Sequence, residues 1–319
     1  MNEDIVVLIP VYDPNEEIMD KFLDKLSKKF KNIVFINDGC NQKHDKYMEK
    51  ISKKYPTLKH NVNLGKGRGL KNGINYILNN YPDAKVIVTV DCDGQHSVKD
   101  IKKCGDMALK NMDSLILGVR DFSEMPTRSK FGNVITRNVL YSFVGQKISD
   151  TQTGLRAMSM DVARKLIDVS GERYEYETNV LIETRTKQIP IKEVFIDTIY
   201  INNNETSHFN PVKDSIRVYK LFASYILFTL FAYIIETIIF AKTYNINDAF
   251  YIIPLFLLLS KIVSSIIKKI FNNHVNWKYV LVNYLVCVVI LSLVKTHVVF
   301  IKVIIDIIMF IISLLCSRK

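Results

Sequence analysis

The chain changes character once, near residue 220, and this change constrains its fold more than any other feature. Up to about Tyr219, charged, polar and apolar residues are mixed, as in a soluble α/β protein. From Leu221 onward the sequence is almost continuously apolar. Helices that are apolar on every side belong in a membrane or in the core of a large protein. We therefore predict two domains, residues 1–215 and residues 216–319.

Four apolar stretches in the second half approach the roughly 20 residues that a helix needs to cross a bilayer. They predict transmembrane helices at about 221–241, 250–267, 279–296 and 298–316. Basic residues gather before the first stretch, after the second and at the chain end: Arg217, Lys220, Lys268, Lys269, Lys278, Arg318 and Lys319. By the positive-inside rule both termini and the first domain are expected in the cytoplasm, in a multi-pass protein of a bacterial-type cytoplasmic membrane. A soluble helical core is the alternative.

The net charge of +11 favours either nucleic acid or an anionic membrane as a partner. The apolar half decides for a lipid bilayer, and no nucleic-acid partner is expected. The N-terminus is acidic and enters a strand at once, which argues against a signal peptide. The five cysteines show no C-x-x-C spacing and are expected to be free thiols of a reducing compartment.

Strand-like and helix-like patterns alternate through the first domain, which predicts an α/β fold with a parallel, doubly wound sheet. Such sheets bind ligands at the carboxyl ends of their strands. Three predicted strands end in polar residues, at Pro10–Asp13, Asn37–Gly39 and Asp91–Gln95. A ligand site is therefore expected along one edge of the sheet.

The strand predicted at Val86–Val90 runs directly into two carboxylates, Asp91 and Asp93. Carboxylates one residue apart at a turn repel each other, and each raises the pKa of the other. A hard divalent cation relieves this repulsion, and oxygen ligands from Asp91, Asp93 and Gln95 suit Mg²⁺ or Mn²⁺. A solvated turn after a strand is the simpler alternative.

A basic, glycine-rich turn, NVNLGKGRGLKNG at residues 61–73, precedes another predicted helix. This turn does not follow the first strand, which argues against a Rossmann dinucleotide site. It also lacks the P-loop spacing G-x-x-x-x-G-K-[ST]. A basic turn at a helix N-terminus still suits a phosphate group.

The motifs PVYDPNEE, FINDG, NLGKGRGLKNG, VDCDGQH, LGVR and DTQTGLRA stand in the order and spacing of family 2 glycosyltransferases. Between Ile5 and Asp214 the chain resembles the polyprenyl-phosphate sugar transferases of the dolichyl-phosphate mannose synthase type. The resemblance implies a GT-A catalytic domain, a nucleotide-diphosphate sugar donor, and an inverting, metal-dependent transfer.

Position by position, the resemblance implies that the nucleoside is held by Pro10, Tyr12 and Asp38, with Lys66 in the basic turn near the nucleotide. It implies that Asp91, Asp93 and Gln95 serve the metal and diphosphate. Asn37 departs from the family pattern, because an Asp usually stands there. His208 also departs, because mannose synthases place a basic residue against the donor phosphates there, and the charge of His depends on pH.

On the acceptor side the resemblance implies roles for Arg120 and Arg128 near the transferred sugar and the acceptor phosphate, with Arg137 in reserve. Asp150 and Arg156 match the acceptor-side motif DTQTGLR. A hydroxyl acceptor needs a general base, whereas a phosphate is already an anion at neutral pH. Asp150 is expected to be that base or to orient Arg156.

The second domain is similar to the GtrA-like four-helix membrane family in KLFASYILFTLFAYIIETIIF, SKIVSSIIKKIFNN and KVIIDIIMFIIS. That family is associated with moving lipid-linked sugars or anchoring their synthases. Lys302 and Asp306 lie four residues apart and can pair on one helix face, and Glu236 and Lys261 could join them. An inert neutral pair is the alternative.

We therefore expect a hexosyltransferase that moves a sugar from a nucleotide-diphosphate donor to a polyprenyl (undecaprenyl) phosphate for cell-envelope glycan synthesis. The alternatives are transfer to a hydroxyl of a wall polymer or glycolipid, and a lipid-linked sugar transporter or anchor with a nucleotide-binding domain. The sequence leaves open whether the chain forms a homo-oligomer.

Overall fold

The structure is a computed structural model that describes residues 2–120 and 148–197 of the first half. In the C-terminal part it describes residues 231–241, 277–293 and 297–315, and the single positions Leu227, Leu258, Lys261, Ile262 and Ser265. Contacts divide the chain into one unit of Met1–Pro126 with Ile148–Val218, and a second of Thr127–Lys147 with Tyr219–Lys319. Arg128, Arg137 and His208 lie outside the described residues.

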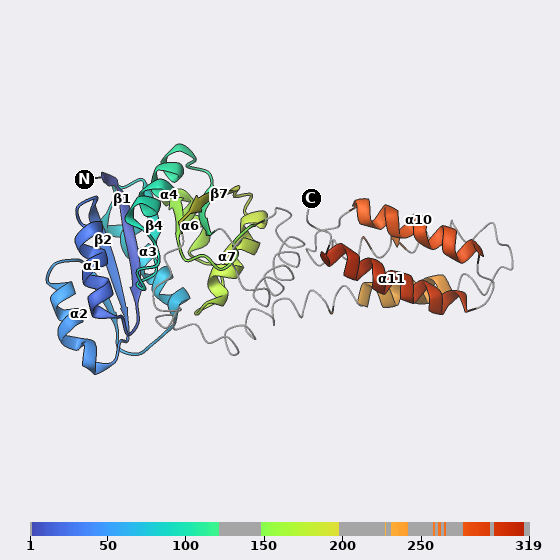
Figure 1. Cartoon of the computed structure of the whole chain (residues 1–319), viewed down its shortest axis with the longest axis horizontal. Helices are drawn as coiled ribbons and strands as arrows, with labels where there is room; N and C mark the ends of the chain where they lie inside the picture. The colour runs from blue at the N-terminus through green and yellow to red at the C-terminus, as the bar shows by residue number, and fades with distance from the viewer. Residues whose placement is uncertain are drawn as a thin grey trace. The chain divides into compact units, whose positions relative to one another are not determined.

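A seven-stranded sheet forms the first unit, in the order β3-β2-β1-β4-β6-β5-β7 (Figure 1). The strands are β1 Asn2–Val11, β2 Phe30–Asp38, β3 Thr57–His60, β4 Val86–Thr89, β5 Leu115–Arg120, β6 Arg156–Ser159 and β7 Ile191–Ile196. β1, β2, β3 and β4 pair in parallel, as do β5 and β7. The predicted parallel sheet is wrong at β6, which runs antiparallel to both of its neighbours.

The reversal of β6 has a direct consequence for the site. β6 runs antiparallel to β4 and β5, so its first residue, Arg156, lies opposite the end of β4 and opposite Leu117 of β5. Thr89, the last residue of β4, is opposite Arg156, the first residue of β6. The motif that precedes β6 is therefore delivered to the same sheet edge as the motif that follows β4.

Helices connect the strands: α1 Glu16–Leu26, α2 Asp45–Ser52, α3 Lys66–Asn80, α4 Val98–Lys110, α6 Met160–Leu166 and α7 Glu175–Thr186, with a short 3₁₀ helix η1 at Gln42–His44. Side-chain oxygens cap three of them, because Asn15, Ser97 and Ser159 each accept a backbone N–H of the first turn. α1 ends at Leu26, and β2 begins at Phe30.

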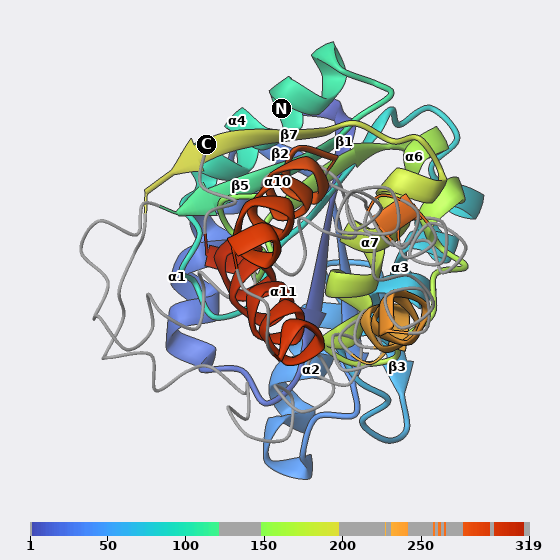
Figure 2. The same ribbon diagram turned by 90° about the vertical axis from the view of Figure 1, so that its right-hand side faces the viewer.

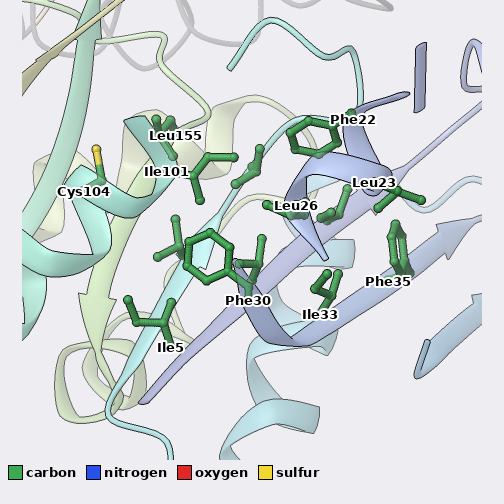
Figure 3. Packing of buried hydrophobic residues seen from close by; sticks show 14 of the residues in the cluster. Ile5, Phe22, Leu23, Leu26, Phe30, Ile33, Phe35, Ile101, Cys104 and Leu155 are labelled. Carbon is green, nitrogen blue, oxygen red and sulfur yellow. The ribbon is translucent and has the colours of Figure 1, made fainter. Parts of the chain in front are cut away.

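Buried apolar side chains hold this frame rigid. Strand β1 is fully buried from Ile5 to Ile9, and the same core contains Phe30, Ile101 and Leu155 (Figure 3). Close packing of this kind resists displacement of the backbone. Loops at the carboxyl edge are therefore carried by a fixed sheet.

The second unit contains a helical segment at residues 231–241, α10 Trp277–Leu293 and α11 Val298–Leu315. α10 and α11 lie side by side (Figures 1 and 2). Among the residues that the structure describes, no helix is both long enough and apolar enough to cross a membrane.

Four charged side chains are buried together in the second unit, and we call them the charge quartet: Glu236, Lys261, Lys302 and Asp306. Lys302 lies 2.6 Å from Asp306 and 2.9 Å from Glu236, so the expected pairing is confirmed. Lys261 lies 2.6 Å from each of the same two carboxylates. Two positive and two negative charges therefore cancel inside an apolar helical unit.

Candidate active site

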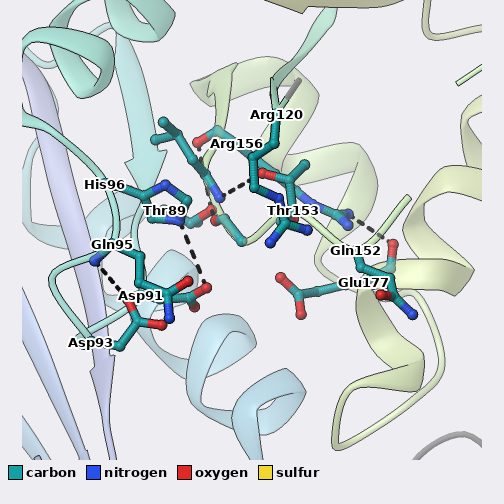
Figure 4. A network of polar contacts seen from close by, with 12 residues as sticks. Thr89, Asp91, Asp93, Gln95, His96, Arg120, Gln152, Thr153, Arg156 and Glu177 are labelled. Carbon is teal, nitrogen blue, oxygen red and sulfur yellow. Dashed lines mark hydrogen bonds and ion pairs between the residues drawn. The ribbon is translucent and has the colours of Figure 1, made fainter. Parts of the chain in front are cut away.

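Residues predicted to form a site lie along the carboxyl edge of the sheet, and Figure 4 shows Asp91, Asp93, Gln95 and Arg120 there. Pro10 and Tyr12 are at the end of β1, Asp38 at the end of β2, and Arg120 at the end of β5. Asp91, Asp93 and Gln95 follow β4. The prediction of one ligand-binding edge therefore agrees with the sheet topology.

Lys66 joins two carboxylates from separate parts of the chain. It is the first residue of α3, and its Nζ lies 2.7 Å from Oδ1 of Asp91 and 3.0 Å from Oε2 of Glu177. Glu177 stands in the first turn of α7, and its side chain is 9% exposed. The basic turn thus contacts the strand-end carboxylate directly.

Charges in this group shift one another's pKa values. Burial alone would lower the pKa of Lys66, but the charges of Asp91 and Glu177 outweigh burial and raise it above its usual value. Burial alone would raise the pKa of Asp91, but Lys66 and His96 lower it well below its usual range. Both groups are therefore charged at neutral pH.

The pKa of Asp93 is shifted in the opposite direction to that of Asp91. Burial and the negative charge of Asp91 raise the pKa of Asp93, although its Oδ1 accepts the backbone N–H of Gln95 at 3.0 Å. Repulsion between the two carboxylates is therefore not fully relieved by the chain's own groups. An added cation at this position would remove it.

The residues present fit a hard divalent metal. Within the described part of the chain, no three His, Cys, Asp or Glu side chains group together as a metal site. The oxygen donors here are the carboxylates of Asp91 and Asp93 and the amide of Gln95. Mg²⁺ characteristically binds through one or two carboxylates and completes its shell with substrate phosphates and water. Such a donor set suits Mg²⁺ or Mn²⁺ better than a softer metal.

Gly154 closes the site behind Asp91, and the sequence patterns did not single it out. A Cβ at this position would overlap the Asp91 carboxylate. Its carbonyl accepts a hydrogen bond from the Thr89 hydroxyl at 3.0 Å, which ties the loop to the end of β4. The only signal in the sequence is the glycine inside DTQTGLRA.

Asp38 holds the basic turn in place. Its carboxylate accepts the backbone N–H groups of Leu64 at 3.0 Å and Gly65 at 2.9 Å. Nδ1 of His60 lies 2.7 Å from Oδ1 of Asp38, and the amide of Asn72 lies 2.9 Å from Nε2 of the same ring. Gly65 has a φ of 102°, which a side chain would strain. Asp38 therefore sets where Lys66 begins α3.

Arg120 forms a two-pronged pair with Asp150. Its Nε lies 2.7 Å from Oδ2, and its Nη2 lies 3.2 Å from Oδ1. Asp150 is 2% exposed, and its Oδ1 also accepts the backbone N–H of Gln152 at 3.1 Å. Asp150 thus orients Arg120, whereas it was expected to be a base or to orient Arg156.

Arg156 is part of the scaffold that carries Glu177. It is 3% exposed, and burial lowers its pKa. Its Nε donates to the Thr153 carbonyl at 3.1 Å and its Nη1 to the Glu177 carbonyl at 2.7 Å. The guanidinium therefore fastens the loop before β6 to the first turn of α7.

Comparison with known proteins agrees with this fold. Residues 6–167, half of the chain, match the family described as Glycosyl transferase family 2. The fold is similar to that of glucosyl-3-phosphoglycerate synthase from Mycobacterium tuberculosis in complex with Mn²⁺, uridine diphosphate and phosphoglyceric acid. That likeness has a TM-score of 0.52 at 15% identity and covers 70% of this chain and 77% of the synthase.

Two relatives are similar in sequence. An uncharacterised protein of Methanocaldococcus jannaschii is 31% identical over 226 residues, which are 69% of this chain and 91% of that protein. A UDP-N-acetylglucosamine–dolichyl-phosphate N-acetylglucosaminyltransferase of Methanococcus voltae is 27% identical over 219 residues, 61% of this chain and 86% of the enzyme. The fold and the site define a glycosyltransferase of the GT-A class. The chain belongs to glycosyl transferase family 2.

Proposed function

We propose that this protein is a metal-dependent membrane glycosyltransferase that moves a sugar from a nucleotide-diphosphate donor to a polyprenyl phosphate. The observation that carries the proposal is the contact of Lys66 with Asp91 beside Asp93, at one strand end. A lysine, a helix N-terminus and two carboxylates suited to a metal are together complementary to a metal-bound diphosphate.

Donor binding is assigned to residues of the first unit. Pro10 and Tyr12 line the edge where the nucleoside is expected, and Asp38 fixes the turn that presents Lys66 to the diphosphate. Asp91, Asp93 and Gln95 would hold the metal, which neutralises charge on the departing diphosphate when bound. The Mn²⁺ and uridine diphosphate in the structure of the M. tuberculosis synthase support this assignment.

The hydrogen bonds of Asp150 favour a phosphate acceptor over a hydroxyl. Both of its oxygens accept hydrogen bonds from Arg120, and one also accepts a backbone N–H. A carboxylate engaged in this way is poorly placed to take a proton from a hydroxyl. A lipid phosphate needs no base and needs an oriented cation, which Arg120 supplies. Arg128 is assigned to the same phosphate on the resemblance alone.

The lipid nature of the acceptor has further support. The M. voltae relative is named for transfer to dolichyl phosphate. The almost continuous apolar sequence from Leu221 onward supports a unit that keeps the enzyme at the bilayer holding such a lipid. We propose a multi-pass arrangement in the cytoplasmic membrane, with the first unit in the cytoplasm.

One experiment tests the proposal. The purified full-length chain is incubated with a panel of nucleotide sugars and either undecaprenyl or dolichyl phosphate, and the lipids are analysed by mass spectrometry. A matched reaction offers a lipid that ends in a sugar hydroxyl. A glycosylated lipid phosphate is the expected product. Transfer to the hydroxyl lipid alone would contradict the proposal and favour the wall-polymer or glycolipid alternative.

A further inference from the structure

Helix α3 begins with the wrong charge for a helix N-terminus. Acidic side chains normally stabilise the first turn, because the helix dipole is positive there. The first turn of α3 contains no acidic residue and instead carries Lys66 and Arg68, with Lys71 soon after. Carboxylates from other segments compensate them: Glu172 pairs with Arg68 and Lys71, while Asp91 and Glu177 pair with Lys66. Positive side chains at this helix end are unfavourable for stability, and the ion pairs with these carboxylates offset that effect.

Lys66 occupies the oxygen of Asp91 that a metal would need. Oδ1 of Asp91 lies 2.7 Å from Nζ of Lys66. On the other side, Nε2 of His96 lies 3.8 Å from Oδ2, and Gly154 lies so close that a Cβ there would overlap both oxygens. Lys66 therefore faces Oδ1, and His96 faces Oδ2. A cation that binds Asp91 through Oδ1 therefore competes with the ammonium group of Lys66.

Glu177 offers Lys66 a second carboxylate within reach. Its Oε2 already lies 3.0 Å from Nζ, and its Oε1 is buried and has no hydrogen-bond partner in the described structure. Arg156 holds the backbone of Glu177 in place through its carbonyl. Lys66 can therefore leave Asp91 without becoming an unpaired buried charge, which would be costly.

We propose that Lys66 is a tethered counter-cation, which neutralises Asp91 in the donor-free enzyme and moves to the donor diphosphate when a metal binds. Glu177 is the positioning residue that keeps Lys66 at the site during this exchange. This inference rests on the proposed function for the identity of the diphosphate donor. It adds that metal binding and the Lys66–Asp91 ion pair are mutually exclusive.

The exchange gives Lys66 opposite effects on two ligands. Without nucleotide, Lys66 competes with the metal, so its removal should tighten metal binding. With metal present, Lys66 faces the diphosphate, so its removal should weaken nucleotide binding. A lysine with a purely structural role would not shift the two affinities in opposite directions.

The test measures binding by the full-length chain with isothermal titration calorimetry. Mn²⁺ is titrated without nucleotide, and then uridine diphosphate is titrated at saturating Mn²⁺. Lys66→Met should lower the Kd for Mn²⁺ about threefold to fivefold, the scale of a partly exposed ion pair. It should raise the Kd for uridine diphosphate about tenfold or more, as expected for a lost hydrogen bond to a charged group.

Lys71→Met is the matched control. Lys71 lies on the same helix and pairs with Glu172 at 2.9 Å. The Lys71→Met substitution removes the same unit of charge as Lys66→Met. Lys71→Met should change the Mn²⁺ affinity only through the loss of one positive charge from the local electrostatic field. If Lys71→Met tightens Mn²⁺ binding as much as Lys66→Met, or if Lys66→Met leaves it unchanged, the exchange is refuted.

Glu177→Gln tests the positioning role. Lys66 is then left with Asp91 as its carboxylate partner, so the Kd for Mn²⁺ should rise severalfold, and the Kd for uridine diphosphate should rise with it. Glu172→Gln is its control and should change neither Kd more than twofold. Unchanged Mn²⁺ affinity in Glu177→Gln would remove Glu177 from the proposal. If this buried variant fails to fold, the comparison of Lys66→Met with Lys71→Met decides the exchange.

These measurements are independent of the acceptor. Opposite shifts in the two affinities would support the exchange even if no lipid phosphate were glycosylated, in which case only the proposed function fails. Conversely, an active lipid-phosphate transferase without the opposite shifts would keep the function and lose the exchange. A wild-type chain that binds no Mn²⁺ would refute both the metal assignment and the exchange.

Discussion

Arg120 and Asp150 meet fork to carboxylate: the two guanidinium nitrogens Nε and Nη2 each bond a different oxygen of Asp150. Such a pair fixes the plane of the guanidinium as well as its position. Asp150 is almost fully buried, and the Arg120 side chain is 26% exposed. The buried carboxylate of Asp150 therefore holds the guanidinium in place, and Arg120 is the residue of the pair that a ligand at the sheet edge can reach.

Substitutions in this pair should separate the two acceptor chemistries. Arg120→Lys keeps the charge but loses the fork, and we expect kcat/KM on a lipid phosphate to fall by about tenfold to a hundredfold. Asp150→Asn should cost less than the roughly 10²–10⁴-fold that follows loss of a general base. Steady-state kinetics with lipid phosphate check both. A larger loss in Asp150→Asn than in Arg120→Lys would instead assign Asp150 as a base.

Metal removal should abolish transfer. Burial and the negative charge of Asp91 both raise the pKa of Asp93, and an added cation would offset both effects. We expect Asp93→Ala and EDTA each to remove nearly all activity, and Mg²⁺ or Mn²⁺ to restore the chelated wild type but not the variant. Product formation is followed by mass spectrometry. Full activity in EDTA would disprove the metal assignment.

Gly154→Ala should damage the site without unfolding the chain. The added Cβ would overlap the Asp91 carboxylate and displace it. We expect Mn²⁺ affinity to fall at least tenfold, while the melting temperature changes little. Gln152→Ala is the control, because Gln152 is an exposed residue of the same loop and keeps its backbone bond to Asp150. Equal Mn²⁺ affinities in the two variants would show that Gly154 does not shape the site.

The charge quartet should tolerate loss of a pair better than loss of one member. Lys302→Met leaves Glu236 and Asp306 with a single lysine, and breaking a buried ion pair costs about 3–5 kcal/mol. The double change Lys302→Met with Glu236→Gln restores neutrality and should recover much of that loss. Thermal unfolding of the full-length chain in detergent measures both. A double variant no more stable than the single one would show that charge balance is not what stabilises this unit.

Cys104 provides a pH test of the sheet's packing. Burial raises the pKa of its thiol from 9.0 to about 12. The unfolded chain therefore loses this proton at lower pH than the native chain, so the stability contribution is complete below pH 9 and is lost progressively between pH 9 and 12. Cys104→Ala should flatten this alkaline loss in urea titrations at several pH values. A slope identical to wild type would count against the effect.

The sequence permitted the prediction that polar residues gather at one edge of the sheet, because parallel strands end together and polar residues follow three of them. It also permitted the prediction that Lys302 pairs with Asp306, because residues four apart share a helix face. The contacts of Lys66 with Asp91 and Glu177 were not predictable, since they join segments far apart along the chain. The reversal of β6 was missed for a related reason, because an apolar strand carries no mark of its direction.

That reversal also separates the enzyme's two tasks along the chain. The residues that we assign to the nucleotide come before β5, whereas Asp150 and the loop around it come between β5 and β6. The reversed strand brings both groups to the same edge of the sheet, where Gly154 of that loop lies against Asp91 and bonds Thr89. A loop grafted between β5 and β6 should therefore change the acceptor without disturbing Asp91 only if it keeps this glycine.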